Sequence, residues 1–346
     1  MTLERTPADD IRQSHNDRLR SASTNGALDE PLAHKRDRLL RLLKDLRCVA
    51  VAYSGGVDSV VVAQAARLAL GDMAIAVTGV SDSLASGELA DAQRVAQQIG
   101  IRHFVLPTEE FANPLYVRNH GDRCFHCKSE LYQRIQQWLT NHHDQLPNHH
   151  DQLSWTSQFV EPTTDAPSLP TAKVIDGHAT GGPVIVNGAN ADDLHDYRPG
   201  MQAAGLFQVR SPLAECELSK TEVRKLARDW QLPVWNKPAT PCLSSRVVYG
   251  EEVTPERLHR IDAAERWLRE LGLQTVRVRD HGNDLARLEV PTDQLQYLCG
   301  AGVRETLAKK LRELGFRFVT LDLEGFRSGS MNQLLSIGLL PEPSDR

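Results

Sequence analysis

The chain of 346 residues has no long apolar run, no excess of positive charge and few cysteines. It has no stretch of about 18 apolar residues, and its N-terminal segment MTLERTPADDIRQSHNDRLR is charged, so we expect no membrane span, no signal peptide and a cytoplasmic protein. The net charge of −5 argues against a dedicated nucleic-acid binder and for a small-molecule substrate. Six cysteines are too few for a disulfide scaffold, which makes any closely spaced pair a candidate for metal or redox chemistry.

The length has room for about two domains, and a hydrophobic content of 40% can fill their cores. Residues 1–34 are polar and without pattern, so we expect a disordered tail. From 35 to 235, strand and helix patterns alternate, which predicts an α/β domain with a doubly wound parallel sheet and a ligand site at the carboxyl ends of its strands. From 236 to 346, including a helix expected over 293–314, the pattern predicts a smaller α+β domain for substrate binding or oligomerisation.

A tandem repeat interrupts the first domain. The sequence NHHDQLPNHHDQL at 141–153 copies six residues around Pro147, and the stretch that follows is rich in Pro and Thr and has no periodicity. We therefore expect an inserted loop over about 141–172. Its four histidines could bind a metal ion, but slippage of a repeat in a tolerant surface loop explains them more simply.

The stretch AYSGGVDSV leaves an apolar strand through glycines and enters an apolar helix. Glycine removes the steric limit of a Cβ, and a helix start offers unpaired N–H donors, so this turn favours a bound anion. Asp58 would repel bare phosphate, and therefore indicates a divalent cation and a metal nucleotide. The turn lacks the Walker pattern G-x-x-x-x-G-K-[ST], so no lysine is offered to the β- and γ-phosphates and γ-phosphoryl transfer is not favoured.

The cysteines occur in two informative places. Cys124 and Cys127 are separated by two residues, which lets two thiolates reach one metal; a structural zinc with a ligand such as His126, or chance spacing, is the alternative. Cys242 lies in PATPCLSSR, where Arg246 and helix-start N–H groups would lower its pKa, as a sulfur nucleophile requires; an inert thiol is the alternative. No role is predicted for the remaining cysteines, of which the first lies in a core strand: Cys48, Cys216 and Cys299.

In its strand-to-helix setting, SGGVDS resembles the pyrophosphate loop (PP-loop) of the ATP pyrophosphatases, which have the adenine nucleotide alpha hydrolase-like fold. These enzymes cleave ATP between the α- and β-phosphates, and the loop holds pyrophosphate while a substrate atom is adenylated. The resemblance implies that ATP and Mg2+ are bound by six consecutive residues: Ser54, Gly55, Gly56, Val57, Asp58 and Ser59.

Five segments together resemble the LarE family of sulfur transferases: AYSGGVDS, RCFHCKSELY, VNGANADDLHDYRPGMQAA, LSKTEVRKLARDWQLPVWNKPATPCLSSR and VRVRDHGNDLARLEV. The resemblance covers about 36–325, apart from the insertion. It implies ATP-dependent sulfur insertion into pyridinium-3,5-biscarboxylic acid mononucleotide, a step towards the nickel-pincer nucleotide cofactor used in lactate racemization. The substrate carboxylate would be adenylated with loss of pyrophosphate, and sulfur would then displace AMP.

The cysteines indicate which members of that family this chain resembles. Some members have one cysteine at the position of Cys242 and sacrifice its sulfur, which leaves dehydroalanine. This chain also has Cys124 and Cys127 and therefore resembles the three-cysteine members, which hold a [4Fe-4S] cluster. Three thiolates leave one iron open to bind and deliver a sulfide. The resemblance thus implies Cys242 and Asp58 as catalytic residues, and the three cysteines as cluster ligands.

A substrate with two carboxylates and a phosphate requires cationic partners. Arg277 and Arg279 alternate along the strand RVR and so share one face, which predicts a phosphate clamp. Arg246 and Arg198 are further candidates, while an exposed strand face would explain any single arginine equally well. Three polar residues after the strand VIVNG are candidates for contacts with ATP or magnesium, unless they serve the turn itself: Asn190, Asp192 and Asp193.

Two alternative functions stay open. A transfer-RNA thiolase would share the loop and the clustered cysteines, but the acidic charge balance gives little support for an RNA-binding surface. A non-catalytic adenine-nucleotide sensor or scaffold would keep the loop but leave Cys242 unexplained. We expect a small-molecule substrate, no nucleic-acid or membrane partner, and a homo-oligomer.

Overall fold

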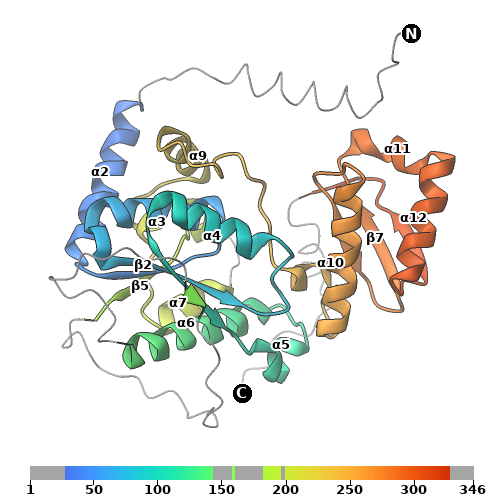
Figure 1. Cartoon of the computed structure of the whole chain (residues 1–346), viewed down its shortest axis with the longest axis horizontal. Helices are drawn as coiled ribbons and strands as arrows, with labels where there is room; N and C mark the ends of the chain where they lie inside the picture. Colours follow the sequence, from blue (N-terminus) through green and yellow to red (C-terminus); the bar gives the residue numbers. More distant parts are fainter. Residues whose placement is uncertain (1–27, 143–157, 160–181, 196–198, 328–346) are drawn as a thin grey trace.

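The computed structural model describes residues 28–142, 158–159, 182–195 and 199–327 (Figure 1). Most of the expected tail, most of the His-rich repeat and the candidate Arg198 lie outside the described residues. Within the described part, no helix is long and apolar enough to cross a membrane.

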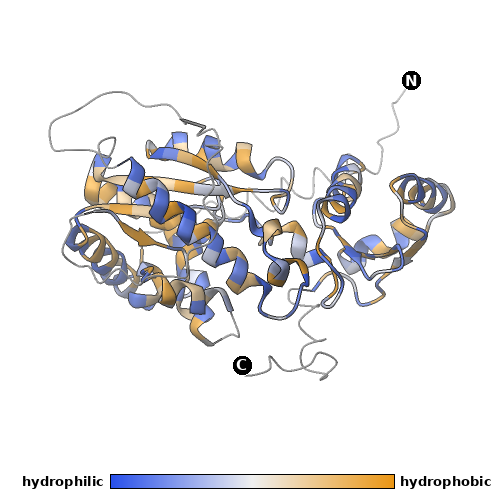
Figure 2. Cartoon of the chain, turned by 90° about the horizontal axis from the view of Figure 1, so that it is seen from below, coloured by the Kyte–Doolittle hydropathy of each residue, from blue (hydrophilic) through white to orange (hydrophobic). Residues whose placement is uncertain are grey.

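The larger sheet has five parallel strands in the order β4-β3-β2-β1-β5. The central strand pairs run in register, with Val49 opposite both Ala74 and Val184. Figure 2 shows apolar residues concentrated along these strands, as expected for a sheet covered on both faces. The strands are β1 (Val49–Ala52), β2 (Ala74–Val80), β3 (Arg102–Pro107), β4 (Gln158–Phe159) and β5 (Val184–Val186).

Helices cover both faces of this sheet (Figure 1), which confirms the predicted doubly wound fold. Alternate residues of β1 point to opposite faces, so Val49 and Val51 join one core while Ala50 joins the other. The first core contains side chains from α2 (Glu30–Asp45), α3 (Val57–Leu70), α4 (Glu88–Ile99), α8 (Pro212–Glu215) and α9 (Lys220–Asp229). The second contains side chains from α6 (Arg123–Asn141) and α7 (Pro199–Leu206).

The predicted helix ends after α3 and α4 are confirmed. Gly71 and Gly100 follow these helices with φ of 59° and 73°, a backbone conformation that a residue with a Cβ rarely adopts. Both turns return the chain towards the next strand, β2 or β3, so that the strands run parallel.

A second region follows, with a three-stranded sheet in the order β6-β7-β8 packed against α10 and α12. In Figure 1 it forms a separate group of elements beside the larger sheet, consistent with the predicted smaller α+β region. The β6–β7 pair is antiparallel and the β7–β8 pair is parallel. Its elements are η5 (Leu243–Arg246), α10 (Pro255–Glu270), β6 (Arg277–Asp280), β7 (Leu285–Glu289), η6 (Thr292–Gln294), α11 (Leu295–Cys299), α12 (Ala301–Glu313) and β8 (Phe318–Leu321).

The structure differs from the sequence expectations in three places. Helix α2 begins at Glu30, inside the expected tail, because Asp29 caps it and Leu32 is buried. The inserted loop contains the two-residue strand β4, paired with β3. The single helix expected over 293–314 is wrong: it is divided at Gly300, whose ψ of 140° is not helical.

The second region is joined to the carboxyl edge of the larger sheet by backbone hydrogen bonds. Leu243 N donates to Ser83 O at 2.8 Å, just beyond the end of β2, and Val253 N donates to Val117 O at 2.9 Å. Val117 ends the short helix α5 (Pro114–Val117), which follows η2 (Glu110–Ala112) after β3. The segment that contains Cys242 is therefore held at the edge where the sequence predicts the ligand site.

Candidate functional site

The loop between β1 and α3 has the form that its glycines predict. Gly55 has φ of +71°, and a Cβ added to it would lie 2.9 Å from the Ala92 Cβ, so no larger residue fits without a shift. Ser59 Oγ accepts a hydrogen bond from Ser54 N at 3.2 Å and donates one to Gly56 O at 3.1 Å. No side chain in the described part caps the first amides of α3, which leaves them available to an anion.

Asp58, in the first turn of α3, is contacted by two residues that are distant in sequence. Asn190 Nδ2 donates to Asp58 Oδ1 at 3.3 Å, and Lys220 Nζ donates to Asp58 Oδ2. Lys220 N also donates to Asp192 Oδ2 at 2.9 Å. The predicted residues Asp58, Asn190 and Asp192 thus lie together, and they surround a lysine that sequence reasoning missed.

Two local features position the residues around Asp58. A Cβ on Gly188 would lie 2.7 Å from Ser59 N, so the loop after β5 lies directly against the start of α3. Ser219 and Glu222 form a capping box that fixes Lys220 as the first residue of α9. The sequence SKTE gives this local signal, but nothing in it points to Asp58. The loop itself lacks a lysine, as predicted, but α9 brings one to it.

The three predicted cysteines come from two segments that meet near this edge. Cys124 and Cys127 lie near the start of α6, three positions apart and therefore on one side of the helix. Cys242 is the residue before η5. Cys124 is exposed, while Cys127 and Cys242 are half-buried.

The three thiols interact through their charges. Burial raises the pKa of the Cys127 thiol far above its ordinary value, and the negative charges of Glu110 and Cys242 raise it further. Burial lowers the pKa of Lys128, but Tyr132 and the three cysteines raise it by more, so its net pKa is raised. Cys124, Cys127 and Cys242 are therefore near enough to interact electrostatically with one another, and Lys128 interacts with all three.

Glu110 adds a buried carboxylate that sequence reasoning also missed. Glu110 is 2% exposed, and its Oε1 accepts hydrogen bonds from Ser81 Oγ at 2.5 Å and Ser83 Oγ at 2.9 Å. Its Oε2 has no hydrogen-bond partner within the described part of the chain. The sequence around it, PTEEFANP, gives no signal that this carboxylate is buried.

The described residues contain no group of three or more His, Cys, Asp or Glu side chains arranged around a single metal ion. A cubane cluster places its thiolate ligands on separate corners, which requires a wider spacing than one ion does. The predicted [4Fe-4S] cluster, which would place its three sulfur ligands roughly 6 to 7 Å apart, stays a prediction.

The predicted phosphate-binding arginines lie side by side but have different partners. Arg246 is fully buried and pairs with Glu265 at 3.0 Å. Arg279 pairs with Glu289 at 2.8 Å and donates to Ser245 O at 2.9 Å. These two arginines are therefore held by buried carboxylates, which gives them a structural role whatever they bind.

Arg277 differs from its neighbours. It is 7% exposed and donates to two carbonyl oxygens, those of Val276 and Ala239, each at 2.8 Å. Burial and the guanidinium groups of Arg246 and Arg279 lower the pKa of Arg277 to about 10. No carboxylate in the described part forms a salt bridge with it. Arg277 is thus the member of the group whose charge most needs an anionic partner.

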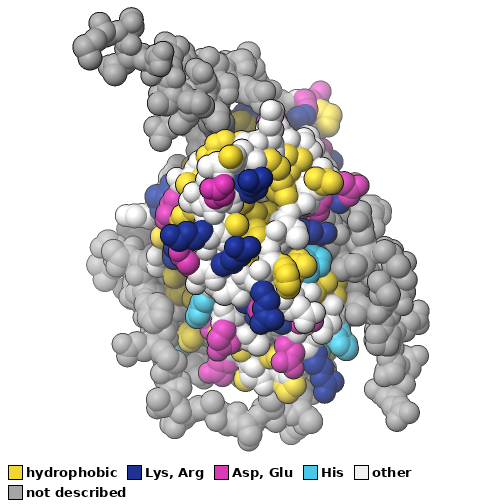
Figure 3. All heavy atoms as spheres, turned by 90° about the vertical axis from the view of Figure 1, so that its right-hand side faces the viewer, with side chains coloured by type: hydrophobic (Ala, Val, Ile, Leu, Met, Phe, Trp, Pro, Cys, Tyr) yellow, Lys and Arg dark blue, Asp and Glu magenta, His cyan; other side chains and the backbone are white. Residues whose placement is uncertain are grey.

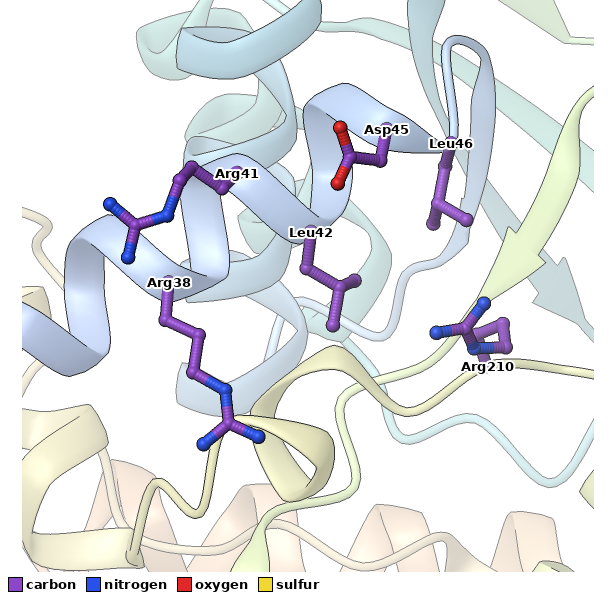
Figure 4. Close-up of a pocket in the computed structure, with 6 residues that line it drawn as sticks. All are labelled: Arg38, Arg41, Leu42, Asp45, Leu46 and Arg210. Atoms are coloured by element: carbon purple, nitrogen blue, oxygen red, sulfur yellow. The ribbon is translucent and has the colours of Figure 1, made fainter.

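Two surfaces away from this edge do not extend the site. Figure 3 views the end of the molecule formed by the second region, where Lys and Arg alternate with Asp, Glu and apolar side chains and form no continuous basic surface. A hollow of about 540 Å3 lies beside α2, and Figure 4 shows the residues that line it. Its Arg210 is hydrogen-bonded to Glu215 at 2.9 Å. The hollow contains none of the predicted site residues and is lined by Arg38, Arg41, Leu42, Asp45, Leu46 and Arg210.

The fold and the site define a class: a doubly wound α/β protein in which an uncapped helix start and three cysteines lie near one edge of a parallel sheet. No family model matches the chain. Individual relatives do match it. The chain is 43% identical to an uncharacterized protein of Synechocystis sp. over 88% of its own length and 99% of that protein.

The chain is also 33% identical to the pyridinium-3,5-bisthiocarboxylic acid mononucleotide synthase of Lactiplantibacillus plantarum, over 88% of its own length and 96% of that enzyme. An uncharacterized protein of Methanocaldococcus jannaschii is 32% identical over 42% of the chain and 55% of its own length. The chain therefore belongs to the LarE family, the family of the Lactiplantibacillus plantarum synthase.

Proposed function

We propose that the protein is an ATP-dependent sulfur transferase of nickel-pincer cofactor synthesis, which converts the carboxylates of pyridinium-3,5-biscarboxylic acid mononucleotide to thiocarboxylates. The observation that carries the proposal is that the glycine loop with Lys220, and the two cysteine segments, all lie at the carboxyl edge of one sheet. Its similarity to the Lactiplantibacillus plantarum synthase supports the choice of substrate.

In the proposed first step, residues 54–59 and Lys220 hold the β- and γ-phosphates of ATP, and Asp58 holds Mg2+ with Asn190 or Asp192 nearby. A carboxylate oxygen of the substrate attacks the α-phosphorus, and the bond to the bridging oxygen breaks. Pyrophosphate leaves, and an acyl adenylate forms. The amides and cations at the helix start stabilise the negative charge that builds up on the leaving pyrophosphate.

In the second step a sulfur nucleophile attacks the acyl carbon, and AMP leaves with the electron pair of the broken bond. Cys124, Cys127 and Cys242 would hold the [4Fe-4S] cluster, since thiolates are its usual protein ligands and the charge of bound iron would offset the cause of the raised pKa of Cys127. When bound, the cluster supplies an open iron that can carry sulfide. Lys128 lies beside these thiols and offsets the negative charge of their ionised forms.

The product pattern tests the proposed function. Protein prepared without oxygen and supplied with iron, sulfide, MgATP and the mononucleotide is expected to release AMP and pyrophosphate in equal amounts and to add sulfur to the substrate. Chromatography of the nucleotides and mass spectrometry of the product measure both. Omitting the mononucleotide is the control, and it should stop pyrophosphate release. ADP as the main product would contradict adenylation.

Replacing Arg277 by alanine is expected to weaken binding of the mononucleotide roughly ten- to a hundredfold and to leave ATP binding nearly unchanged. The reason is that the charge of Arg277 lies beside two paired arginines and would be matched by the substrate phosphate. Calorimetric titration with each ligand separates the two effects. Arg317→Ala is the control, since that side chain is 75% exposed. Equal losses for both ligands would place the phosphate elsewhere.

A further inference from the structure

We propose that Arg123 is the positioning residue that fixes the Cys242 segment against Cys124; the inference rests on the proposed function, in which these cysteines act together. Arg123 is the first residue of α6, directly before Cys124, and is 4% exposed. Its Nη1 donates to Ser244 O at 2.8 Å and also to Asn119 Oδ1. One guanidinium group thus joins the start of α6 to the backbone two residues after Cys242.

Asn119 extends this connection. It is fully buried and has φ of 55°, in the left-handed region that asparagine tolerates. Its Nδ2 donates to Val248 O at 2.8 Å and to Glu251 O at 2.9 Å. The contacts of Asn119 therefore fix the chain after η5, while its Oδ1 orients Arg123.

A second hydrogen bond holds the same residue of the cysteine segment. The hydroxyls of Tyr116 and Ser244 lie 2.6 Å apart, so Ser244 is held through its side chain as well as its carbonyl oxygen. Tyr116 lies in α5, which precedes α6 in the chain, and it is 1% exposed. Because Ser244 lies in η5, directly after Cys242 and Leu243, these contacts restrict where the Cys242 backbone can lie.

The charge of Arg123 gives it a role that a neutral side chain of similar length cannot take. A guanidinium group donates charge-assisted hydrogen bonds, which are stronger than those of a neutral donor, and Arg123 makes such bonds to Ser244 O and Asn119 Oδ1. A methionine would fill much the same space but donate to neither oxygen.

Thiol bridging in the full-length, metal-free chain tests this inference without ATP or substrate. In a Cys127→Ala background, a short bis-alkylating reagent such as dibromobimane should bridge Cys124 to Cys242, and mass spectrometry of the digested protein measures the yield. Arg123→Met is expected to lower the bridging rate about tenfold or more, since it removes a charged hydrogen bond. Arg123→Lys keeps the charge but not the planar fork of the guanidinium group. Its bridging rate should lie between that of the protein with Arg123 and that of Arg123→Met.

Arg134→Met is the matched control, because Arg134 lies on the same helix and pairs with Glu130 at 2.8 Å on the surface. In Arg123→Ala, millimolar guanidinium should restore bridging while equal urea should not, which separates the charged contact from general destabilisation. Wild-type bridging in a folded Arg123→Met protein, or no recovery with guanidinium, would overturn the inference. Intact bridging without pyrophosphate release in the active-enzyme assay would instead count against the proposed function.

Discussion

Replacing Asp58 by asparagine is expected to slow pyrophosphate release by about a hundredfold or more while leaving the protein folded. Asparagine keeps the size of the side chain and a hydrogen bond with Asn190, but it loses the negative charge proposed to hold Mg2+. The pair of Asp58 with Lys220 is partly exposed, with side chains 23% and 35% accessible, so its loss costs little stability. Initial rates of pyrophosphate release and a thermal melt measure the two effects.

Variants of Lys220 show whether Asp58 contacts the nucleotide or only holds the lysine in place. Lys220→Met should also slow the reaction, because it removes a cation from the proposed phosphate site. If the two residues contact the nucleotide separately, the double variant should lose approximately the product of the two factors. If they act only as a pair, the double variant should equal one single variant. Asp72→Asn, which breaks a surface pair with Arg67, is the control. Full activity of Asp58→Asn would refute the proposed magnesium site.

The sequence predicts the fold where local pattern decides it. Strands β1 to β3 are apolar runs that end in polar turns, and Gly71 and Gly100 mark helix ends, so the parallel sheet follows from periodicity alone. The break at Gly300 had a signal too, since a glycine inside a helical pattern weakens it. The apolar residues around that glycine nevertheless gave a continuous helical spacing, which led to one helix in place of two.

The site was predictable only in part, because its residues are joined by contacts between distant segments. Lys220 is 162 positions from Asp58, and no local pattern relates them. The arginines of β6 were recognisable from RVR, but Glu289, the partner of Arg279, comes from β7, and Glu265 of α10 pairs with the neighbouring Arg246. A charge pattern in one strand reveals which face the side chains share. It does not reveal whether a buried carboxylate already occupies that face.

The cysteines lead to the prediction that best distinguishes sulfur delivery by a cluster from loss of the sulfur of Cys242. If Cys124, Cys127 and Cys242 hold a cluster as proposed, the reconstituted protein should bind about four irons per chain. Cys124→Ala should lose most of that iron, because two thiolates are too few to hold the cluster. It should also lose repeated turnover, since the sulfur would no longer be replaced between cycles. Iron analysis and the amount of product formed per enzyme chain measure these losses.

Cys299→Ala is the matched control, since Cys299 is exposed at the end of α11 and belongs to neither cysteine segment. It should keep both iron and turnover. Cys124→Ala protein that still forms many products per chain would exclude the cluster mechanism. A single product per chain, with Cys242 converted to dehydroalanine in wild-type protein, would instead show that Cys242 gives up its own sulfur. In that case the other two thiols would serve to set the charge around Cys242, whose segment Arg123 connects to theirs.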